Sequence, residues 1–82
     1  MDVRENIRSY IIENFLFGDP EPLRGDDISL LESGIIDSVG VMELVAELEG
    51  TFHLTVDDSD LVPENLDSID NLVRFITRKK VA

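Results

Sequence analysis

The chain has 82 residues, of which eighteen are acidic and seven basic, giving a formal net charge of −11. Such a charge disfavours nucleic acids and anionic membranes as partners and favours surfaces that present Lys and Arg. The length allows one small domain, and a hydrophobic fraction of 43% is ordinary for a globular protein. Without cysteine there are neither disulfides nor a thiol nucleophile. No membrane-spanning run or signal peptide is recognisable, so we expect a cytoplasmic monomer without membrane insertion.

The first predicted helix runs from Asp2 to about Leu16. One face carries apolar residues at helical spacing, and the opposite face carries charged ones: Val3, Ile7, Tyr10, Ile11 and Phe15 against Arg4, Glu5, Arg8 and Glu13. Glycine and prolines after Phe17 end this helix. The stretch from there to Ile36 lacks clear periodicity, but it holds enough apolar side chains to attach to a core. We therefore expect a long ordered loop, with room for one short helical turn.

The second predicted helix begins at Asp37-Ser38 and ends near Gly50, because Asp and Ser satisfy the free N–H groups of a first helical turn. One arc of this helix is the expected core face: Val41, Leu44, Val45, Leu48 and Phe52. A second apolar arc with acidic neighbours lies nearly opposite: Val39, Met42 and Ala46, flanked by Glu43, Glu47 and Glu49. Since a surface helix needs only one apolar stripe, the second predicts a strip for docking a partner. The alternative is chance exposure of small apolar residues.

The remainder of the chain completes an all-α prediction. The alternating residues 51–56 have no partner strand and are interpreted as an extended loop, followed by a short helical turn over Ser59–Pro63. Asp67 or Ser68 then caps a last helix with a buried stripe and a basic end: Ile69, Leu72, Val73 and Ile76, then Arg78, Lys79 and Lys80. We expect a single domain over 1–82, a small bundle of three main helices plus one short helix, with order lost from about residue 79.

Little in the sequence predicts catalysis. His53 is the one histidine and has no acid–nucleophile arrangement around it, so no enzyme is expected. Asp57, Asp58 and Asp60 are a weak candidate for a cation site, but they lack the spacing of an EF-hand loop, and we expect no metal site. Ser38 is different, because a phosphate attached there would lie beside free backbone N–H groups and the positive end of a helix dipole. The sequence therefore indicates a modification site at Ser38.

At this serine the chain resembles the acyl and peptidyl carrier proteins, whose attachment motif is Gly-x-x-Asp-Ser-Leu/Met. The matching residues are Gly34-Ile35-Ile36-Asp37-Ser38-Val39, and the resemblance covers about residues 28–76. It implies that Ser38, with Asp37 as its motif neighbour, receives 4′-phosphopantetheine from coenzyme A. The thiol of that group would then carry an acyl or aminoacyl group as a thioester between enzymes.

The resemblance also implies a set of partners. They are a phosphopantetheinyl transferase, an adenylating acyl or aminoacyl ligase, and a downstream acyltransferase or synthase. Five residues match positions at which family members dock basic, apolar partner surfaces: Val39, Met42, Glu43, Ala46 and Glu47.

Two features depart from the fatty-acid carriers. Val39 stands where Leu or Met is usual, and Gly40 stands where those carriers typically have Asp. The order Asp-Ser-x-Gly is closer to D-alanyl carrier proteins and to stand-alone carriers served by an adenylating ligase. A second pair, Asp67-Ser68, lacks the Gly-x-x lead and is interpreted as a helix cap. The alternative hypothesis for the whole chain is an unmodified acidic helical module that binds a basic partner.

Overall fold

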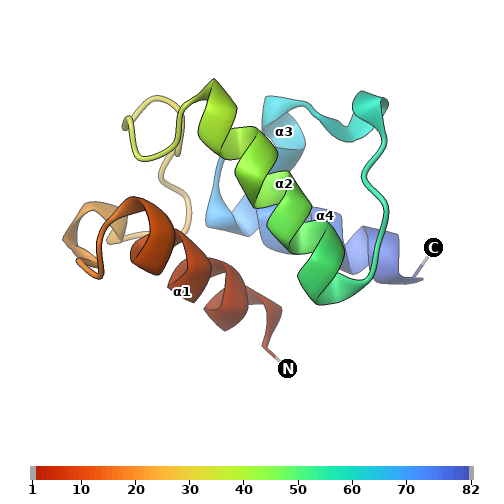
Figure 1. The fold of residues 1–82 in the computed structure, drawn as a ribbon, viewed down its shortest axis with the longest axis horizontal. Coiled ribbons are helices and arrows are strands. Elements are labelled where there is room, and N and C mark those ends of the chain that lie inside the picture. The colour runs from red at the N-terminus through yellow and green to blue at the C-terminus, as the bar shows by residue number, and fades with distance from the viewer. Residues whose placement is uncertain (1, 82) are drawn as a thin grey trace.

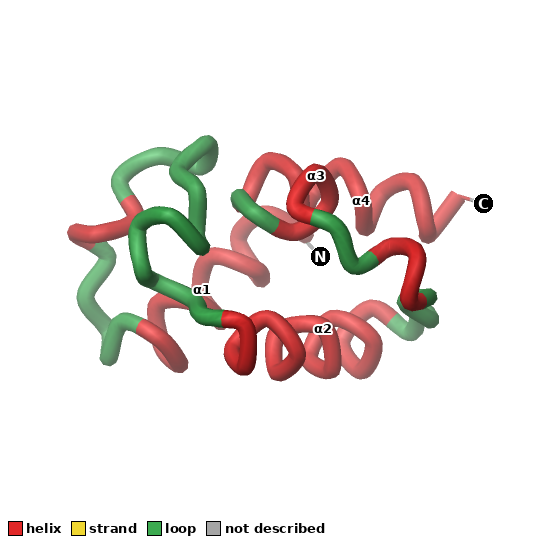
Figure 2. Tube along the Cα trace, turned by 90° about the horizontal axis from the view of Figure 1, so that it is seen from above, coloured by secondary structure: helices red, strands yellow, loops and turns green. Residues whose placement is uncertain are grey.

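The computed structural model describes residues 2–81, and within them it is all-helical. The helices are α1 (Val3–Phe15), α2 (Ser38–Phe52), α3 (Pro63–Leu66) and α4 (Ile69–Val81), with 3₁₀ turns at Glu21–Leu23 and Asp58–Asp60. In Figure 1, α1 and α2 run in opposite directions on the near side, with α4 behind them. Seen from above, α2 and α4 lie on opposite sides of the molecule (Figure 2). The expected fold of three main helices and one short helix is confirmed.

One hydrophobic core joins the helices and the long loop. Its buried members are Ile7 and Ile11 of α1, Leu44, Val45, Leu48 and Phe52 of α2, Leu66 of α3, Ile69, Leu72, Phe75 and Ile76 of α4, and Leu23, Leu30 and Ile36 of the loop. Val41 and Val73, which we expected in the core, are only half-buried, whereas Phe75 was not expected and is 1% exposed. Full burial of a Leu or Ile side chain contributes about 1.5–3 kcal/mol to the stability of the fold. Leu23, Leu30 and Ile36 therefore help to hold the long loop against the helices.

The long loop is also held by charge. Nη1 of Arg4 lies 2.6 Å from Oδ2 of Asp26 and 2.6 Å from Oδ1 of Asp70. Arg8 donates to Oδ1 of Asp26 (3.1 Å) and to the carbonyl of Leu23 (2.9 Å). The hydrogen bonds to Asp70 and Asp26 raise the pKa of Arg4. The sequence placed both arginines on the face opposite the apolar one, but it did not predict these partners, which are carboxylates of the loop and of α4.

The sequence left open whether Asp67 or Ser68 caps α4, and in the structure the two residues have different roles. Ser68 is the cap, because its Oγ accepts the amide of Asn71 at 3.1 Å. The Asp67 carboxylate instead accepts the amide of Leu31 (2.9 Å) and the hydroxyl of Ser29 (2.6 Å). Asp67 thus fastens the end of the long loop to the start of α4.

The segment between α2 and α4 corrects two boundaries. α2 continues to Phe52, so the first two residues of the predicted extended loop are helical, and His53 closes the helix in the left-handed region at φ 55°. The short helix begins at Pro63, where we had placed the end of a turn. A proline is tolerated in the first turn because its missing N–H has no partner there.

The C-terminal end of α4 reaches Val81 in the structure. Nζ of Lys79 lies 2.8 Å from Oδ2 of Asp60, which ties this end to the loop before α3. The expected loss of order from about residue 79 stays a prediction. Among the described residues, no helix combines the length and apolar character that crossing a bilayer requires.

Candidate functional site

Ser38 is the first residue of α2 and is exposed to solvent. The preceding residue, Asp37, is in the extended region and caps the helix, since its Oδ1 accepts the amide of Gly40 at 2.7 Å. Among residues 2–81, no hydrogen bond engages the Ser38 hydroxyl. The helix start that the Asp-Ser pair predicts is confirmed, with the serine side chain accessible and beside the positive end of a helix of 15 residues.

The other Asp-Ser pair differs in its burial. The Ser68 side chain is 6% exposed, and its hydroxyl is occupied in capping α4. A modifying enzyme cannot reach a serine buried in this way without unfolding the start of α4. Both pairs lie at the start of a helix, but Asp37 caps α2 and leaves Ser38 exposed, whereas Ser68 itself caps α4.

Gly40 lets the end of α1 come close to the start of α2. A Cβ atom at position 40 would lie 2.9 Å from Cε1 of Phe15 and 3.0 Å from Cγ2 of Ile36. It would also lie 3.3 Å from the Oδ1 of Asp37 that caps the helix. Gly40 is buried, so close packing of Phe15 and Ile36 against the first turn of α2 requires that this position carry no side chain.

An apolar groove lies between the start of α2 and the α3 region, and Ser38 is part of its wall. The groove has a volume of about 320 Å³ and is lined by Leu31, Ser38, Val41, Met42, Leu61, Val62, Pro63 and Leu66. An exposed serine at a helix N-terminus suits a phosphate ester, and an adjacent apolar groove suits a flexible arm attached through that ester. The residues around Ser38 therefore fit a phosphorylated prosthetic arm.

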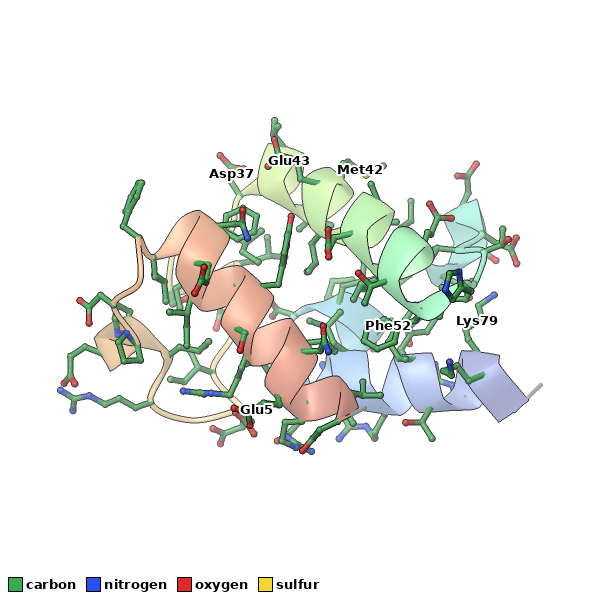
Figure 3. All side chains as sticks on the ribbon, turned by 60° about the horizontal axis from the view of Figure 1, so that its bottom comes forward. Glu5, Asp37, Met42, Glu43, Phe52 and Lys79 are labelled. Atoms are coloured by element: carbon green, nitrogen blue, oxygen red, sulfur yellow. The ribbon has the colours of Figure 1, made fainter. Side chains whose placement is uncertain are left out.

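The five residues that the sequence predicts as a docking strip are exposed on the outer side of α2. Val39 and Met42 are 70% and 54% exposed, and Glu43, Ala46 and Glu47 are exposed as well. Figure 3 shows Met42 and Glu43 on the outer side of α2, and Phe52 on the side toward α4. The separation of α2 into a buried and an exposed apolar face agrees with the sequence pattern. Glu49 is not part of the outer face, because its carboxylate accepts the amide of Val56 at 2.9 Å.

The acidic loop before α3 is used for internal pairing. Asp57 and Asp60 form a capping box around the 3₁₀ turn, and Lys79 lies 2.8 Å from Asp60. The hydrogen bond from Lys79 lowers the pKa of Asp60. In the part of the chain that the structure describes, no three acidic or histidine side chains are grouped to hold a metal ion, Asp58 included.

Comparison with known proteins identifies the kind of site. A family model described as "Phosphopantetheine attachment site" matches residues 11–76, which include the whole Ser38 region. The chain belongs to this family. Membership in the phosphopantetheine attachment family confirms the resemblance drawn from the motif and makes the chain a carrier protein. Its cofactor is covalently attached 4′-phosphopantetheine.

Individual relatives extend the match over most of the chain. A D-alanyl carrier protein of Streptococcus suis (strain 98HAH33) is 36% identical over 73 residues, 89% of both chains. A D-alanyl carrier protein of Streptococcus mutans is 29% identical over 82 residues, which is 100% of both chains. The likeness to the D-alanyl type that Asp-Ser-x-Gly suggested is thereby confirmed at the level of relatives.

Sequence reasoning missed two parts of this phosphopantetheine attachment region. The groove wall formed by Leu61, Val62 and Pro63 comes from a segment far from Ser38 in the chain, and periodicity carries no signal for it. The contact between Phe15 and Gly40 did have a signal. A glycine in the first turn of an otherwise strong helix lowers helix propensity, which indicates a close approach by another element.

Proposed function

We propose that Ser38 is the attachment site of 4′-phosphopantetheine and that the holo protein carries D-alanine as a thioester. The observation that carries this proposal is the exposed Ser38 hydroxyl at the capped start of α2, within the matched residues 11–76. Ser33 and Ser59 are also exposed, but neither begins an α-helix, and Ser68 is buried. Ser38 alone among these serines combines access with a helix N-terminus.

The local structure supports the attachment chemistry. Transfer forms an ester bond between the Ser38 oxygen and the pantetheine phosphate and breaks the pyrophosphate bond of coenzyme A. Adenosine 3′,5′-bisphosphate is the leaving group, and the hydroxyl proton is released. The product phosphodiester is an anion, which the N–H groups and dipole at the start of α2 stabilise. Asp37 keeps this turn in place by capping it through Gly40. The arm supplies the thiol that holds the cargo, since the chain has no cysteine of its own.

The proposed cargo rests on the relatives and on one local feature. The proteins of Streptococcus suis and Streptococcus mutans are D-alanyl carrier proteins, and Gly40 gives this chain the Asp-Ser-x-Gly order that we associated with that type. Gly40 also has no space for the Asp of fatty-acid carriers, because its neighbours approach a Cβ position within 3.0 Å. These features favour an aminoacyl cargo, and D-alanine in particular, over a fatty acyl chain.

The proposed partners act in a sequence around the α2 surface. A phosphopantetheinyl transferase modifies Ser38, an adenylating ligase loads the thiol, and an acyltransferase or synthase removes the cargo. The strip of Val39, Met42, Glu43, Ala46 and Glu47 offers an apolar centre with an acidic rim, which suits apolar partner surfaces edged by Lys and Arg. We propose that the carrier works as a cytoplasmic monomer, with no nucleic acid partner.

Intact-mass measurement tests the attachment site. The chain is incubated with coenzyme A and a broad-specificity phosphopantetheinyl transferase, and wild type is compared with Ser38→Ala. We expect wild type and the exposed-serine controls Ser33→Ala and Ser59→Ala to gain one phosphopantetheine, and Ser38→Ala to gain none. Peptide mapping that placed the adduct on another serine would refute the assignment.

A loading assay tests the cargo. Holo protein is incubated with ATP, a D-alanine-adenylating ligase, and either D-alanine or L-alanine. We expect a thioester with D-alanine that hydroxylamine cleaves, and much slower loading with L-alanine. Efficient loading by a fatty-acid ligase with no D-alanine thioester would show that the carrier assignment is right and the cargo wrong.

A further inference from the structure

Phe17 is the most exposed large hydrophobic residue of the described chain. Its side chain is 94% exposed, and its backbone has φ 54°, in the left-handed region. It follows the end of α1, where the carbonyl of Ile12 accepts the amides of Leu16 (3.2 Å) and Gly18 (2.9 Å). A position of this kind after a helix usually holds glycine, since a bulky side chain is strained there.

Phe17 is therefore unfavourable for the stability of the fold in two separate ways. The ring gains nothing from the core, because it is almost wholly in water, and its backbone conformation is one that phenylalanine disfavours. Glycine is present only one position later, at Gly18, which is also left-handed at φ 86°. A large aromatic residue held outward at a strained position is typical of a binding anchor.

The surroundings place this anchor at the Ser38 end of the molecule. Phe15 packs against Gly40, so the end of α1 lies beside the start of α2. Between them is an open groove of about 350 Å³, which we call the α1–α2 groove. It is lined by Asn14, Phe15, Gly34, Ile35, Asp37, Val39, Gly40 and Glu43. Phe17 follows Phe15 of the groove wall by two residues in the chain and is not itself among the lining residues.

The charges around this surface specify the partner's chemistry. Asp37 and Glu43 of the groove and Asp19 beside Phe17 are all exposed acids. Arg24, the nearest cation along the chain, is paired with Glu21. A second copy would bring the same acids and its own net charge of −11 against them, which opposes self-association. The surface suits a protein with an apolar pocket bordered by Lys or Arg.

We propose that Phe17 and the α1–α2 groove dock the adenylating ligase that loads the carrier. Phe17 enters an apolar pocket of the ligase, and cationic side chains of the ligase face Asp37 and Glu43. This inference rests on the proposed function. A ligase is favoured over the transferase because it reacts with a thiol at the end of a long arm. It can therefore use a contact at Phe17, which is outside the residues that flank Ser38, whereas the transferase must enclose Ser38 itself.

The test compares Phe17→Gly with Phe17→Leu in holo protein. Phe17→Gly removes the ring and relieves the left-handed strain, so its melting temperature should equal or exceed that of wild type. We expect its KM for loading by the same D-alanine-adenylating ligase to rise about tenfold or more, as for loss of a binding anchor. Its kcat and its rate of modification by the transferase should not change. Phe17→Leu, which keeps an apolar side chain, should recover most of the KM.

Three results would overturn this inference. The first is an unchanged KM in Phe17→Gly, and the second is an equal slowing of the ligase and of the transferase. The third is a concentration-dependent dimer of wild type that Phe17→Gly abolishes in sedimentation, since a second copy would then be the occupant. A chain that is never modified at Ser38 refutes the proposed function instead. If holo protein loads with D-alanine and Phe17→Gly loads with the same KM as wild type, only the docking surface is refuted.

Discussion

The ring of Phe15 packs against Gly40 so closely that a Cβ atom at position 40 would lie 2.9 Å from its Cε1. The same Cβ would press on the buried Ile36 at 3.0 Å. Gly40→Ala should therefore destabilise the fold, because overpacking costs about 1–3 kcal/mol and the gain in helix propensity is at most about 1 kcal/mol. Urea unfolding measures the difference, and transferase kinetics should show slower modification of the displaced Ser38.

Gly50 provides a matched control in the same helix. It is exposed, and a Cβ there would meet nothing within 4 Å. Gly50→Ala should stabilise the protein by about 0.5–1 kcal/mol, opposite in sign to Gly40→Ala. Adding Phe15→Leu to Gly40→Ala should recover part of the loss by opening space. A Gly40→Ala protein as stable as Gly50→Ala would show that Phe15 and Ile36 move aside easily.

The sequence predicted those parts of the fold that depend on local pattern. The two faces of α2 followed from spacing, and the start at Ser38 followed from its capping pair, because both are properties of a single helix. The long loop was correctly expected to be ordered, since it contributes Leu30 and Ile36 to the core. The candidate serine could be proposed from the sequence because its motif lies within one continuous segment, and its assignment stays a prediction.

What the sequence did not predict depends on contacts between distant segments. The ion pairs of Arg4 and Arg8 were not predicted, because nothing in the sequence of α1 reveals Asp26 of the loop and Asp70 of α4 as their partners. The strain at Phe17 is likewise invisible before the backbone is known. Boundaries near Pro63 were uncertain for a different reason, since proline suits both the end of one turn and the start of the next helix.

Salt should stabilise this protein. Of its seven basic side chains, Arg4, Arg8, Arg24 and Lys79 are already paired with carboxylates, which leaves an excess of unpaired acids that repel one another. Raising NaCl from about 0.01 M to 0.15 M shortens the screening length from about 30 Å to about 8 Å and weakens this repulsion. We expect the melting temperature to rise by several degrees, about 4–8 °C for each kcal/mol gained. A melting temperature that falls with salt would mean that the ion pairs outweigh the repulsion.

The ion pair between Asp60 and Lys79 should make stability sensitive to acid. Lys79 lowers the pKa of Asp60 below its ordinary value of 3.8. A carboxyl group with a lowered folded pKa stabilises the fold above its unfolded pKa, and this contribution disappears as the pH falls through the folded pKa. The melting-temperature difference between wild type and Lys79→Met should therefore shrink as the pH drops below about 3.8. Asp58→Asn is the control, because Asp58 is exposed and outside this ion pair, and it should leave the pH profile unchanged.

The two apolar faces of α2 should separate folding from partner binding. Met42 is 54% exposed on the outer face, whereas Leu44 and Leu48 are 0% and 2% exposed in the core. Met42→Ala should therefore change the free energy of unfolding by no more than about 0.5 kcal/mol, as surface changes do. Leu44→Ala and Leu48→Ala should each cost about 2–5 kcal/mol. Because small domains have a total stability of only about 5–15 kcal/mol, either core change can unfold much of the protein.

Changes on the outer face of α2, which leave stability almost unchanged, should slow the reactions with partner enzymes. Replacing both Glu43 and Glu47 by Lys reverses the charges that border Met42, and should slow modification by the transferase and loading by the ligase through a lower association rate. Met42→Ala should weaken the same complexes by removing an apolar contact. Met42→Ala should keep a melting temperature near that of wild type, and the double Lys variant should melt no lower than wild type, because it reduces the repulsion among the acids. Unfolding is then excluded as the cause. If the double Lys variant reacts at wild-type rates at low and at physiological salt, the acids of α2 serve solubility and do not steer partners.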